Sequence, residues 1–206
     1  VSTLIDFNNL YRALERLGRG TVFGTRQAPD ATRLKVIDEI CAAAEKLSER
    51  RHGALIVLQR NSSLDEYIHT GTPMDSVVTA DLMVTIFWPK TELHDGAVII
   101  DNNGRIASAA SVLPLTASRN LPDPNMGTRH RAAKGISEVG DALCVVVSEE
   151  TGKIAITNSG NMIARLDTER LRLHLNAQYG PSQEENISLI GRLREVMQDV
   201  TGKVQT

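Results

Sequence analysis

Aromatic side chains are scarce in this chain of 206 residues, where Phe, Trp and Tyr together make up 3%. The core must therefore be aliphatic, and a platform of aromatic rings for stacking nucleic-acid bases is not expected. Cysteine is equally rare, and Cys41 and Cys144 match no metal-binding spacing and no redox motif. Their apolar surroundings predict two reduced thiols in the core, as in a cytosolic protein.

Long apolar runs are also missing, and no secretory leader is visible. No run in the sequence approaches the roughly 18 residues that a membrane-spanning helix needs. Charge of one sign does not dominate, since 23 basic and 25 acidic residues leave a net charge of −2. This balance argues against a nucleic-acid partner but allows a local phosphate pocket. We expect a cytoplasmic domain that would reach a membrane only through segments missing from this chain.

Apolar periodicity predicts the fold class. The order of helical and strand patterns favours an α/β chain with a mixed central β-sheet flanked by helices. Helical spacing is found at 9–17, 30–51, 79–87, 131–139, 168–179 and 187–200, and strand patterns at 54–58, 97–100, 106–112, 143–147 and 154–157. Asp30 is expected to be the N-cap of the long second helix. The strand 54–58 is apolar throughout, which predicts burial on both faces.

One boundary is visible, at Gly180-Pro181. We expect a lead-in helix and loop at 1–28, a main domain at 29–180, and a C-terminal helical appendage at 181–206. A Gly-rich phosphate loop ending in Lys-Ser or Lys-Thr is absent from the sequence. The best-known nucleotide-binding motif is therefore excluded.

The first informative motif is His94-Asp95-Gly96-Ala97, which opens the apolar run Val98–Ile100. Here an acidic residue, Asp95, lies at the start of a strand that is predicted to be buried. The glycine after it lets a ligand approach the backbone closely. Taken alone, the motif also fits an ordinary turn aspartate.

The second motif is Gly127-Thr128-Arg129-His130-Arg131, directly before Ala132-Ala133. Cationic groups after a glycine turn at the start of a helix can clamp a phosphate, because the free backbone amides there also bind anions. An exposed cationic loop is the alternative.

The third motif is Ser148-Glu149-Glu150 at the end of a predicted strand. Its paired acids could hold a divalent cation, or could simply be the solvated turn of a hairpin. All three motifs lie at strand ends or helix starts, where a sheet scaffold presents functional groups. An acid that can hold a metal and a fork of arginines are the groups that phosphoryl transfer needs.

These motifs resemble the diadenylate cyclase (DAC) domain. The likeness covers roughly residues 30–165, and the joint occurrence of Asp-Gly-Ala and Gly-Thr-Arg-His-Arg in this order is highly specific. It is closest to the branch whose cyclase domain follows N-terminal membrane helices, here without those helices. The matching segments are Gly53–Val57, Tyr67–Gly71, Leu93–Ile100, Leu113–Thr116, Gly127–Glu138 and Val146–Gly152.

The resemblance implies a DAC-type fold, condensation of two ATP molecules to cyclic di-AMP with release of two pyrophosphates, and a need for Mg²⁺ or Mn²⁺. It implies a catalytic set of Asp95, Gly96, Ala97, Thr128, Arg129 and His130. Substrate binding is expected from Leu113, Gly127, Thr128, Arg129, His130, Arg131, Ser148 and Glu149, and metal binding from His94, Asp95 and Glu150. The branch often has an aromatic residue before Leu-Pro-Leu, where this chain has Val112.

The resemblance also implies a homodimer in which two domains meet face to face, each holding one ATP. The modest charge and the shortage of aromatic residues suggest a transient contact. Two other functions stay open. A regulatory module that binds nucleotide without turnover would keep Arg129 and Arg131 but would not need Asp95. A nucleotide phosphohydrolase would use similar groups to direct a water molecule.

Overall fold

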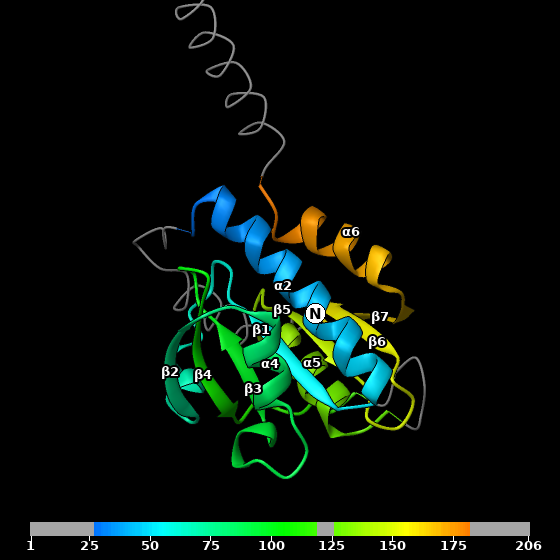
Figure 1. Ribbon diagram of the computed structural model, residues 1–206. Coiled ribbons are helices and arrows are strands. Elements are labelled where there is room, and N and C mark those ends of the chain that lie inside the picture. Colours follow the sequence, from blue (N-terminus) through cyan, green and yellow to red (C-terminus); the bar gives the residue numbers. More distant parts are fainter. Residues whose placement is uncertain (1–26, 119–125, 182–206) are drawn as a thin grey trace, which may run out of the picture.

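A seven-stranded mixed sheet forms the centre of the protein, in the order β2-β4-β3-β1-β5-β6-β7 (Figure 1). The computed structural model describes residues 27–118 and 126–181. The strands are β1 (Ala54–Leu58), β2 (Thr72–Val77), β3 (Ala97–Ile100), β4 (Arg105–Ser111), β5 (Leu143–Val147), β6 (Ile154–Asn158) and β7 (Asn161–Leu166). The helices are α2 (Asp30–Arg50), α3 (Asp65–Ile68), α4 (Ala80–Ile86), α5 (Thr128–Val139), α6 (Thr168–Gln178) and the short 3-10 helix η1 (Glu92–His94). The predicted α/β class with a mixed sheet is confirmed.

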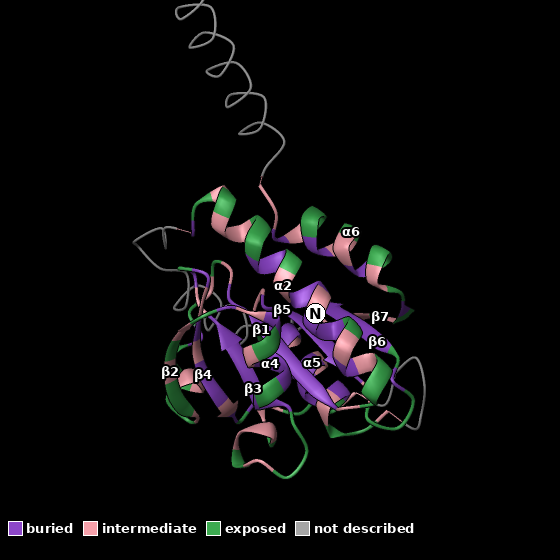
Figure 2. Cartoon of the chain, in the orientation of Figure 1, coloured by how far each residue is buried: buried purple, intermediate pink, exposed green. Residues whose placement is uncertain are grey.

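Strand β1 lies at the centre of the sheet. It pairs parallel with β3 and antiparallel with β5, and all five of its residues are buried. Its side chains alternate between two hydrophobic clusters. Ala54, Ile56 and Leu58 belong to one, and Leu55 and Val57 to the other. The prediction of a strand buried on both faces is therefore confirmed, and Figure 2 shows the buried strands between the helical layers.

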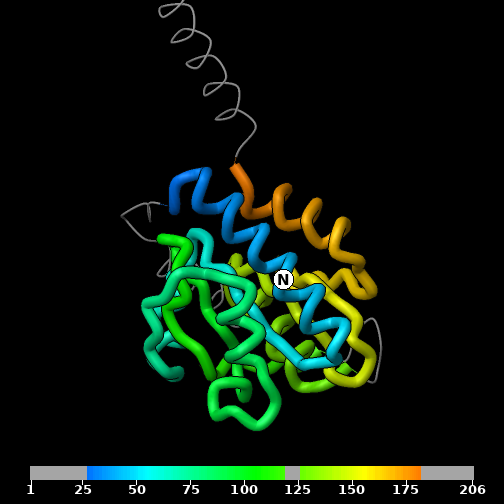
Figure 3. The backbone as a smooth tube through the Cα atoms, viewed as in Figure 1, coloured from blue at the N-terminus to red at the C-terminus, as the bar shows by residue number. Residues whose placement is uncertain are grey.

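The two clusters define the two faces of the sheet. One cluster contains buried residues of α2, α4 and α6, and the other contains those of α5. Helices α2 and α6 are far apart in the sequence but lie side by side over the first face (Figure 3). Helix α5 covers the second face, and Tyr67 and Ile68 of α3 also pack against its cluster. The N-terminal end of α5 is close to the predicted site residues. No helix in the described ranges combines the length and the apolar character needed to cross a bilayer.

Several predicted boundaries differ from the structure. Helix α2 begins at Asp30 itself, with Pro29 at the N-cap position and no side-chain capping bond, so the prediction of Asp30 as the N-cap is wrong. Asp30 instead pairs with Arg33 one turn later. Helix α5 begins at Thr128, three residues earlier than predicted, because the polar residues of its first turn carry no apolar pattern. The helices predicted at 9–17 and 187–200 lie outside the described residues.

Two strands were not predicted from the sequence, β2 and β7. They occupy the two edges of the sheet, and their residues are exposed or half-buried except for Leu166 at the end of β7. Edge strands need fewer apolar side chains, and β2 also contains Pro73, a residue suited to an edge position. The apolar pattern that reveals central strands is therefore weak in both.

Both cysteines are free and buried, as the sequence predicts. Burial raises the pKa of the Cys41 thiol to about 11. Burial also raises the pKa of Cys144 to about 12, against a hydrogen bond with Thr157 that lowers it. Neither thiol is a reactive thiolate at neutral pH.

Asp141 stabilises the loop after β1, and its loss is expected to be costly. Its carboxylate accepts the backbone N–H groups of Asn61 and Ser62, each at 3.0 Å. Replacing Asp141 with Ala leaves both donors without this acceptor, and we expect a loss of about 1–3 kcal/mol in the free energy of unfolding. Urea titrations of both proteins at pH 7 measure this difference.

The same carboxylate predicts a pH dependence. Burial raises the pKa of Asp141, but hydrogen bonds from Ser62 and Asn61 and the charge of Arg60 outweigh it and hold the pKa below its usual value of 3.8. Its contribution to stability is therefore full above the unfolded-state pKa and is lost as the pH falls through the folded-state pKa. Asp141→Asn should flatten the acid limb of the stability curve. Equal acid sensitivity in both proteins would contradict this role.

Candidate active site

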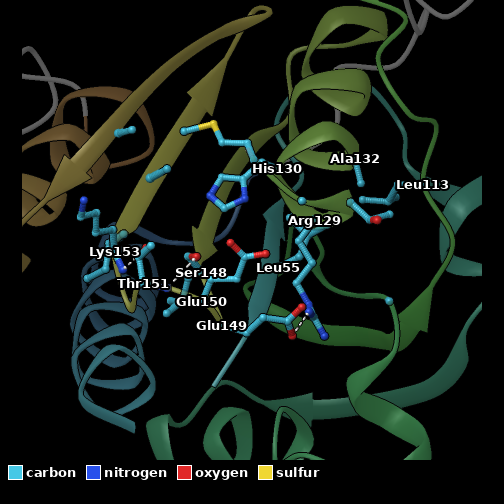
Figure 4. Close-up of a pocket in the computed structure, with 18 of the residues that line it drawn as sticks. Leu55, Leu113, Arg129, His130, Ala132, Ser148, Glu149, Glu150, Thr151 and Lys153 are labelled. Atoms are coloured by element: carbon cyan, nitrogen blue, oxygen red, sulfur yellow. Dashed lines mark hydrogen bonds and ion pairs between the residues drawn. The ribbon is translucent and has the colours of Figure 1, made fainter. Parts of the chain in front are cut away.

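A cavity of about 840 Å³ opens beside the N-terminal end of α5 and the turn between β5 and β6 (Figure 4). Residues from all three sequence motifs line it, together with the segment after β4. Eleven of the predicted site residues are among them: His94, Asp95, Gly96, Leu113, Gly127, Thr128, Arg129, His130, Ser148, Glu149 and Glu150. Motifs spread over 57 positions of the sequence, from His94 to Glu150, are thus brought to one cavity.

The N-terminal end of α5 contributes backbone donors. Gly127 is its N-cap residue and makes no side-chain capping bond, so amides of the first turn have no partner within the helix. Thr128, Arg129 and the buried His130 line the cavity at this end. A Cβ atom on Gly127 would meet no described atom within 4 Å. Internal packing therefore does not require this glycine, whereas a ligand close to the helix end would.

Arg129 joins three segments of the site. One guanidinium nitrogen donates to Glu149 at 2.6 Å, and the other donates to the backbone carbonyl of His94 at 3.3 Å. Its Nε is buried without a hydrogen-bond partner among the described residues. A Cβ on Gly53 would lie 2.7 Å from the guanidinium, so the glycine before β1 leaves the space that Arg129 occupies. The arginine is held in place before any ligand binds.

The backbone around Asp95 is tightly constrained. Gly96 has a φ of +131°, which L side chains rarely adopt, and a Cβ there would lie 2.6 Å from the carbonyl carbon of Ala110. Ala110 itself has a positive φ of 55°, and the β3–β4 pairing contains register shifts at this point. The chain therefore passes from η1 through Asp95 into β3 along a backbone path that only glycine at position 96 permits. The carboxylate is presented at the start of an inner strand of the sheet, on a constrained backbone.

The β5–β6 turn presents the third motif. The backbone N–H of Ser148 donates to Lys153 O at 3.0 Å, and the N–H of Gly152 donates to Ser148 O at 2.8 Å. Gly152 has a φ of +70°, and its carbonyl accepts the hydroxyl of Ser48 at the end of α2, at 2.6 Å. Helix α2 thereby fixes the turn that carries Glu149 and Glu150.

The segment after β4 is held against α5. A Cβ on Gly135 would lie 2.1 Å from the carbonyl oxygen of Pro114, so only glycine allows this approach. The hydroxyl of Thr116 donates to Glu138 at 2.8 Å, and its N–H donates to Arg131 O at 3.0 Å. Leu113 is fixed in the cavity wall by these contacts.

An apolar surface stays open beside Leu113. Val112 and Leu115 line the cavity and are 67% and 51% exposed. Val112 stands where the resembling branch often has an aromatic side chain. An aliphatic surface of this kind can pack on a planar base, although it cannot stack on it as a ring does.

Two predicted residues do not line the cavity. The side chain of Ala97 is completely buried in the cluster beneath α5. Arg131 is exposed, and its guanidinium donates to the carbonyl of Thr116 at 3.4 Å. Sequence reasoning also missed lining residues, notably Lys153 and Arg165. Lys153 follows the acidic turn closely and could have been suspected, whereas Arg165 belongs to the edge strand that was not predicted.

The predicted metal ligands share the cavity but do not form a complete metal site. No group of three or more His, Cys, Asp or Glu side chains in the described ranges is placed to hold a metal ion. His94 Nδ1 is hydrogen-bonded to the backbone carbonyl of Thr91, and Glu149 forms an ion pair with Arg129. Asp95 and Glu150 have no such partner among the described residues. These donors fit Mg²⁺ or Mn²⁺ bound mainly through substrate phosphates, with one or two protein carboxylates.

The comparisons with known proteins agree with this arrangement. The family model described as the DisA bacterial checkpoint controller nucleotide-binding (DAC) domain matches residues 41–162, which is more than half of the chain. This chain belongs to the DAC family. The matched range includes all three motifs around the cavity.

Relatives within the DAC family are similar over much of this chain. The cyclic di-AMP synthase CdaA of Bacillus subtilis is 42% identical over 180 residues, covering 87% of this chain and 65% of the relative. A diadenylate cyclase of Listeria monocytogenes is 48% identical over 164 residues, covering 79% of this chain and 59% of the relative. The chain thus spans less than two thirds of the length of these relatives.

Solved structures of similar chains share the fold. A double mutant of DacA from Staphylococcus aureus matches with a TM-score of 0.68 and 43% identity, covering 70% of this chain and 95% of that one. A hypothetical membrane spanning protein from Bacillus cereus matches with a TM-score of 0.59 and 49% identity, covering 63% and 62%. The DAC fold of this chain is thereby established.

Proposed function

We propose that this protein is a diadenylate cyclase that condenses two ATP molecules into cyclic di-AMP and two pyrophosphates. The proposal rests on one observation. Three segments line the same cavity, namely Asp95, the start of α5 at Thr128 and Arg129, and the Ser148–Glu150 turn. A cavity of about 840 Å³ is within the usual range for sites that enclose a small ligand. Relatives named as diadenylate cyclases or cyclic di-AMP synthases support the same activity.

The reaction joins the 3′-hydroxyl oxygen of one ATP to the α-phosphorus of the other. The bond from that phosphorus to the pyrophosphate oxygen breaks, and the hydroxyl proton is lost. We assign Asp95 to orient this hydroxyl or accept its proton. The first-turn amides of α5, with Thr128, Arg129 and His130, bind phosphate oxygens. Positioning and charge stabilisation then supply most of the catalysis.

The remaining lining residues complete the substrate site. Ser148 donates to the triphosphate, and backbone groups of Leu113 bind the adenine edge. Arg131, which donates to Thr116 in the structure, would have to move to reach a phosphate. Mg²⁺ or Mn²⁺, held by Asp95 and Glu150 with His94 or Glu149 as a further ligand, would screen the charge of the leaving pyrophosphate.

We also propose that residues 29–180 form the cyclase domain and that it acts in the cytoplasm, where ATP is available. The segments 1–28 and 181–206 are proposed as additions to that domain. Any membrane attachment would come from segments outside this chain, as the name of the B. cereus relative suggests.

The proposed reaction requires two copies of the domain. Each cavity holds one ATP, and a cyclic dinucleotide needs two ATP molecules in opposed orientation, which a two-fold axis supplies. If this contact is transient, specific activity should rise with protein concentration in the dilute range. Measurements of activity and sedimentation over the same dilution series test this. Activity that stays flat where only monomer sediments would rule out the face-to-face arrangement.

Mixing two inactive variants tests the same arrangement. An Asp95→Asn chain mixed with an Arg129→Ala chain should remain nearly inactive, because both bonds of the ring must form in one dimer. Recovery of substantial activity would show that one intact Asp95 and one intact Arg129 in a dimer suffice to form both bonds of the ring.

Incubation with ATP and Mn²⁺, followed by chromatography, tests the proposed function. A cyclase yields cyclic di-AMP and pyrophosphate. A regulatory module that only binds nucleotide yields no product, and a phosphohydrolase yields ADP or AMP. Either of the last two outcomes would overturn the proposal.

A further inference from the structure

The charges that line the cavity do not by themselves favour ATP. Three carboxylates face three cations there, namely Asp95, Glu149 and Glu150 against Arg129, Lys153 and Arg165. Arg129 is already paired with Glu149 at 2.6 Å, so much of its charge is compensated inside the protein. The side chains of Lys153 and Arg165 form no ion pair with any residue in the described ranges. They are the two uncompensated cations of the wall.

A β-bulge gives Arg165 its position. Ala155 pairs with Ala164, but the preceding residue of β6, Ile154, pairs with Leu166, so Arg165 is an extra residue in β7. In a regular strand, residues two apart lie on the same face. Here Ala164 packs against the cluster beneath α5, whereas Leu166 is buried in the cluster beneath α2 and α6. The strand changes phase at Arg165, whose side chain lines the cavity.

The bulge brings Leu166 into the cluster beneath α2 and α6, but it places Arg165 itself in a costly backbone conformation. This residue has a φ of +62°, a left-handed conformation that is unfavourable for a side chain of this kind. Its exposed guanidinium gains no described partner in return. Strained backbone positions and bulges gather at functional sites, where they aim a side chain at a ligand.

The sheet places these two cations at one end of the site. The cavity lies at the end of the sheet where Ser111 pairs with Ala97, Ala54 with Val147, Val147 with Ile154, and Ile154 with Leu166. The apolar surface of Val112 and Leu115 follows Ser111, and Lys153 and Arg165 flank the last pair. Figure 4 likewise shows Leu113 and Lys153 on opposite sides of His130. A nucleotide with its base at Leu113 would extend its phosphates toward β6 and β7.

We propose that Lys153 and Arg165 bind the β- and γ-phosphates of ATP, the part of the substrate that leaves as pyrophosphate. The inference rests on the proposed function for the identity of the nucleotide. Each cation would form charge-assisted hydrogen bonds to phosphate oxygens. Arg129 alone cannot neutralise these phosphates, because its own charge is already paired with Glu149. Lys153 and Arg165 therefore distinguish a triphosphate from a monophosphate.

The test compares binding of 3′-deoxyATP and 3′-deoxyAMP, in Mg²⁺, to the wild type and to Lys153→Met and Arg165→Gln. Neither nucleotide has the attacking hydroxyl, so binding is measured without cyclisation. Each variant should lose about 10-fold in affinity for 3′-deoxyATP and keep its affinity for 3′-deoxyAMP. Arg170→Gln is the matched control, since it removes an exposed arginine of α6 that does not line the cavity.

A second variant separates binding from a structural role. Arg165→Gly should raise the thermal midpoint by about 2–4 °C, because glycine tolerates the positive φ, and should still lower 3′-deoxyATP affinity as Gln does. A residue with only a structural role would not combine higher stability with weaker triphosphate binding.

The outcomes distinguish this inference from the proposed function. Unchanged triphosphate affinity in the variants, or equal losses for both nucleotides, overturns the inference even if the wild type makes cyclic di-AMP. Selective loss of triphosphate binding supports the inference even if the wild type makes no cyclic product, in which case the proposed function fails alone. A wild type that binds neither nucleotide overturns both.

Discussion

Replacing Asp95 with Asn should reduce the formation of cyclic di-AMP by about 10²-fold or more, while ATP still binds. The amide has the shape of the acid but lacks the charge that orients the 3′-hydroxyl or accepts its proton. The backbone supports this separation of effects, because Gly96 at a φ of +131° and the close contact with Ala110 fix the position of residue 95. Steady-state kinetics and calorimetric titration with ATP measure the two quantities.

A matched control is available in the same segment. Glu92→Gln removes a carboxylate from η1, and Glu92 does not line the cavity. Its activity should equal that of the wild type. If Asp95→Asn also stays within a few-fold of the wild type, the carboxylate does not take part in the reaction and our assignment is wrong.

Replacing Arg129 with Ala should weaken both ATP affinity and turnover, with a loss of about 10²-fold in kcat/KM. The guanidinium donates to Glu149 and to the carbonyl of His94 from its two terminal nitrogens. A lysine has a single ammonium group and cannot keep this fork, so Arg129→Lys should also be a poor enzyme. Calorimetry and kinetics on both variants, side by side, give the comparison.

The lower kcat/KM of Arg129→Ala should come from a changed active site rather than from unfolding of the protein. Glu149 is 63% exposed, and an ion pair of this kind contributes less than about 1 kcal/mol to stability. The thermal midpoint of Arg129→Ala should therefore stay close to that of the wild type. Unchanged affinity and rate in both the Ala and the Lys variants would make the segment an ordinary cationic loop.

The central elements of the fold could be predicted because burial leaves a pattern in the sequence. Strand β1 is apolar at every position since both of its faces are covered, and α2 repeats apolar residues along one side. The edge strands β2 and β7 need less apolar surface, so their residues carry no comparable pattern. The position of Arg165 depends on a bulge in one of these edges, and pairing register is a property of two strands together.

The site was predictable to a similar degree. Three motifs could be found because each places polar residues against an apolar run, but their meeting depends on the order of strands in the sheet. Ala97 illustrates the limit of reasoning by motif, since its side chain is in the core although its neighbours line the cavity. Arg131 illustrates another limit, because the helix start at Thr128 turns its side chain toward Thr116.

We propose a face-to-face reaction in which each of two cavities holds one nucleotide and the two nucleotides are joined through their 3′-hydroxyls. Its most direct test is the pyrophosphate released from ATP and from 3′-deoxyATP under the same conditions, measured together with the nucleotide products. We expect two pyrophosphates for each cyclic di-AMP formed from ATP, and none from 3′-deoxyATP alone. Release of pyrophosphate or phosphate from 3′-deoxyATP would show attack by water and would contradict the claim.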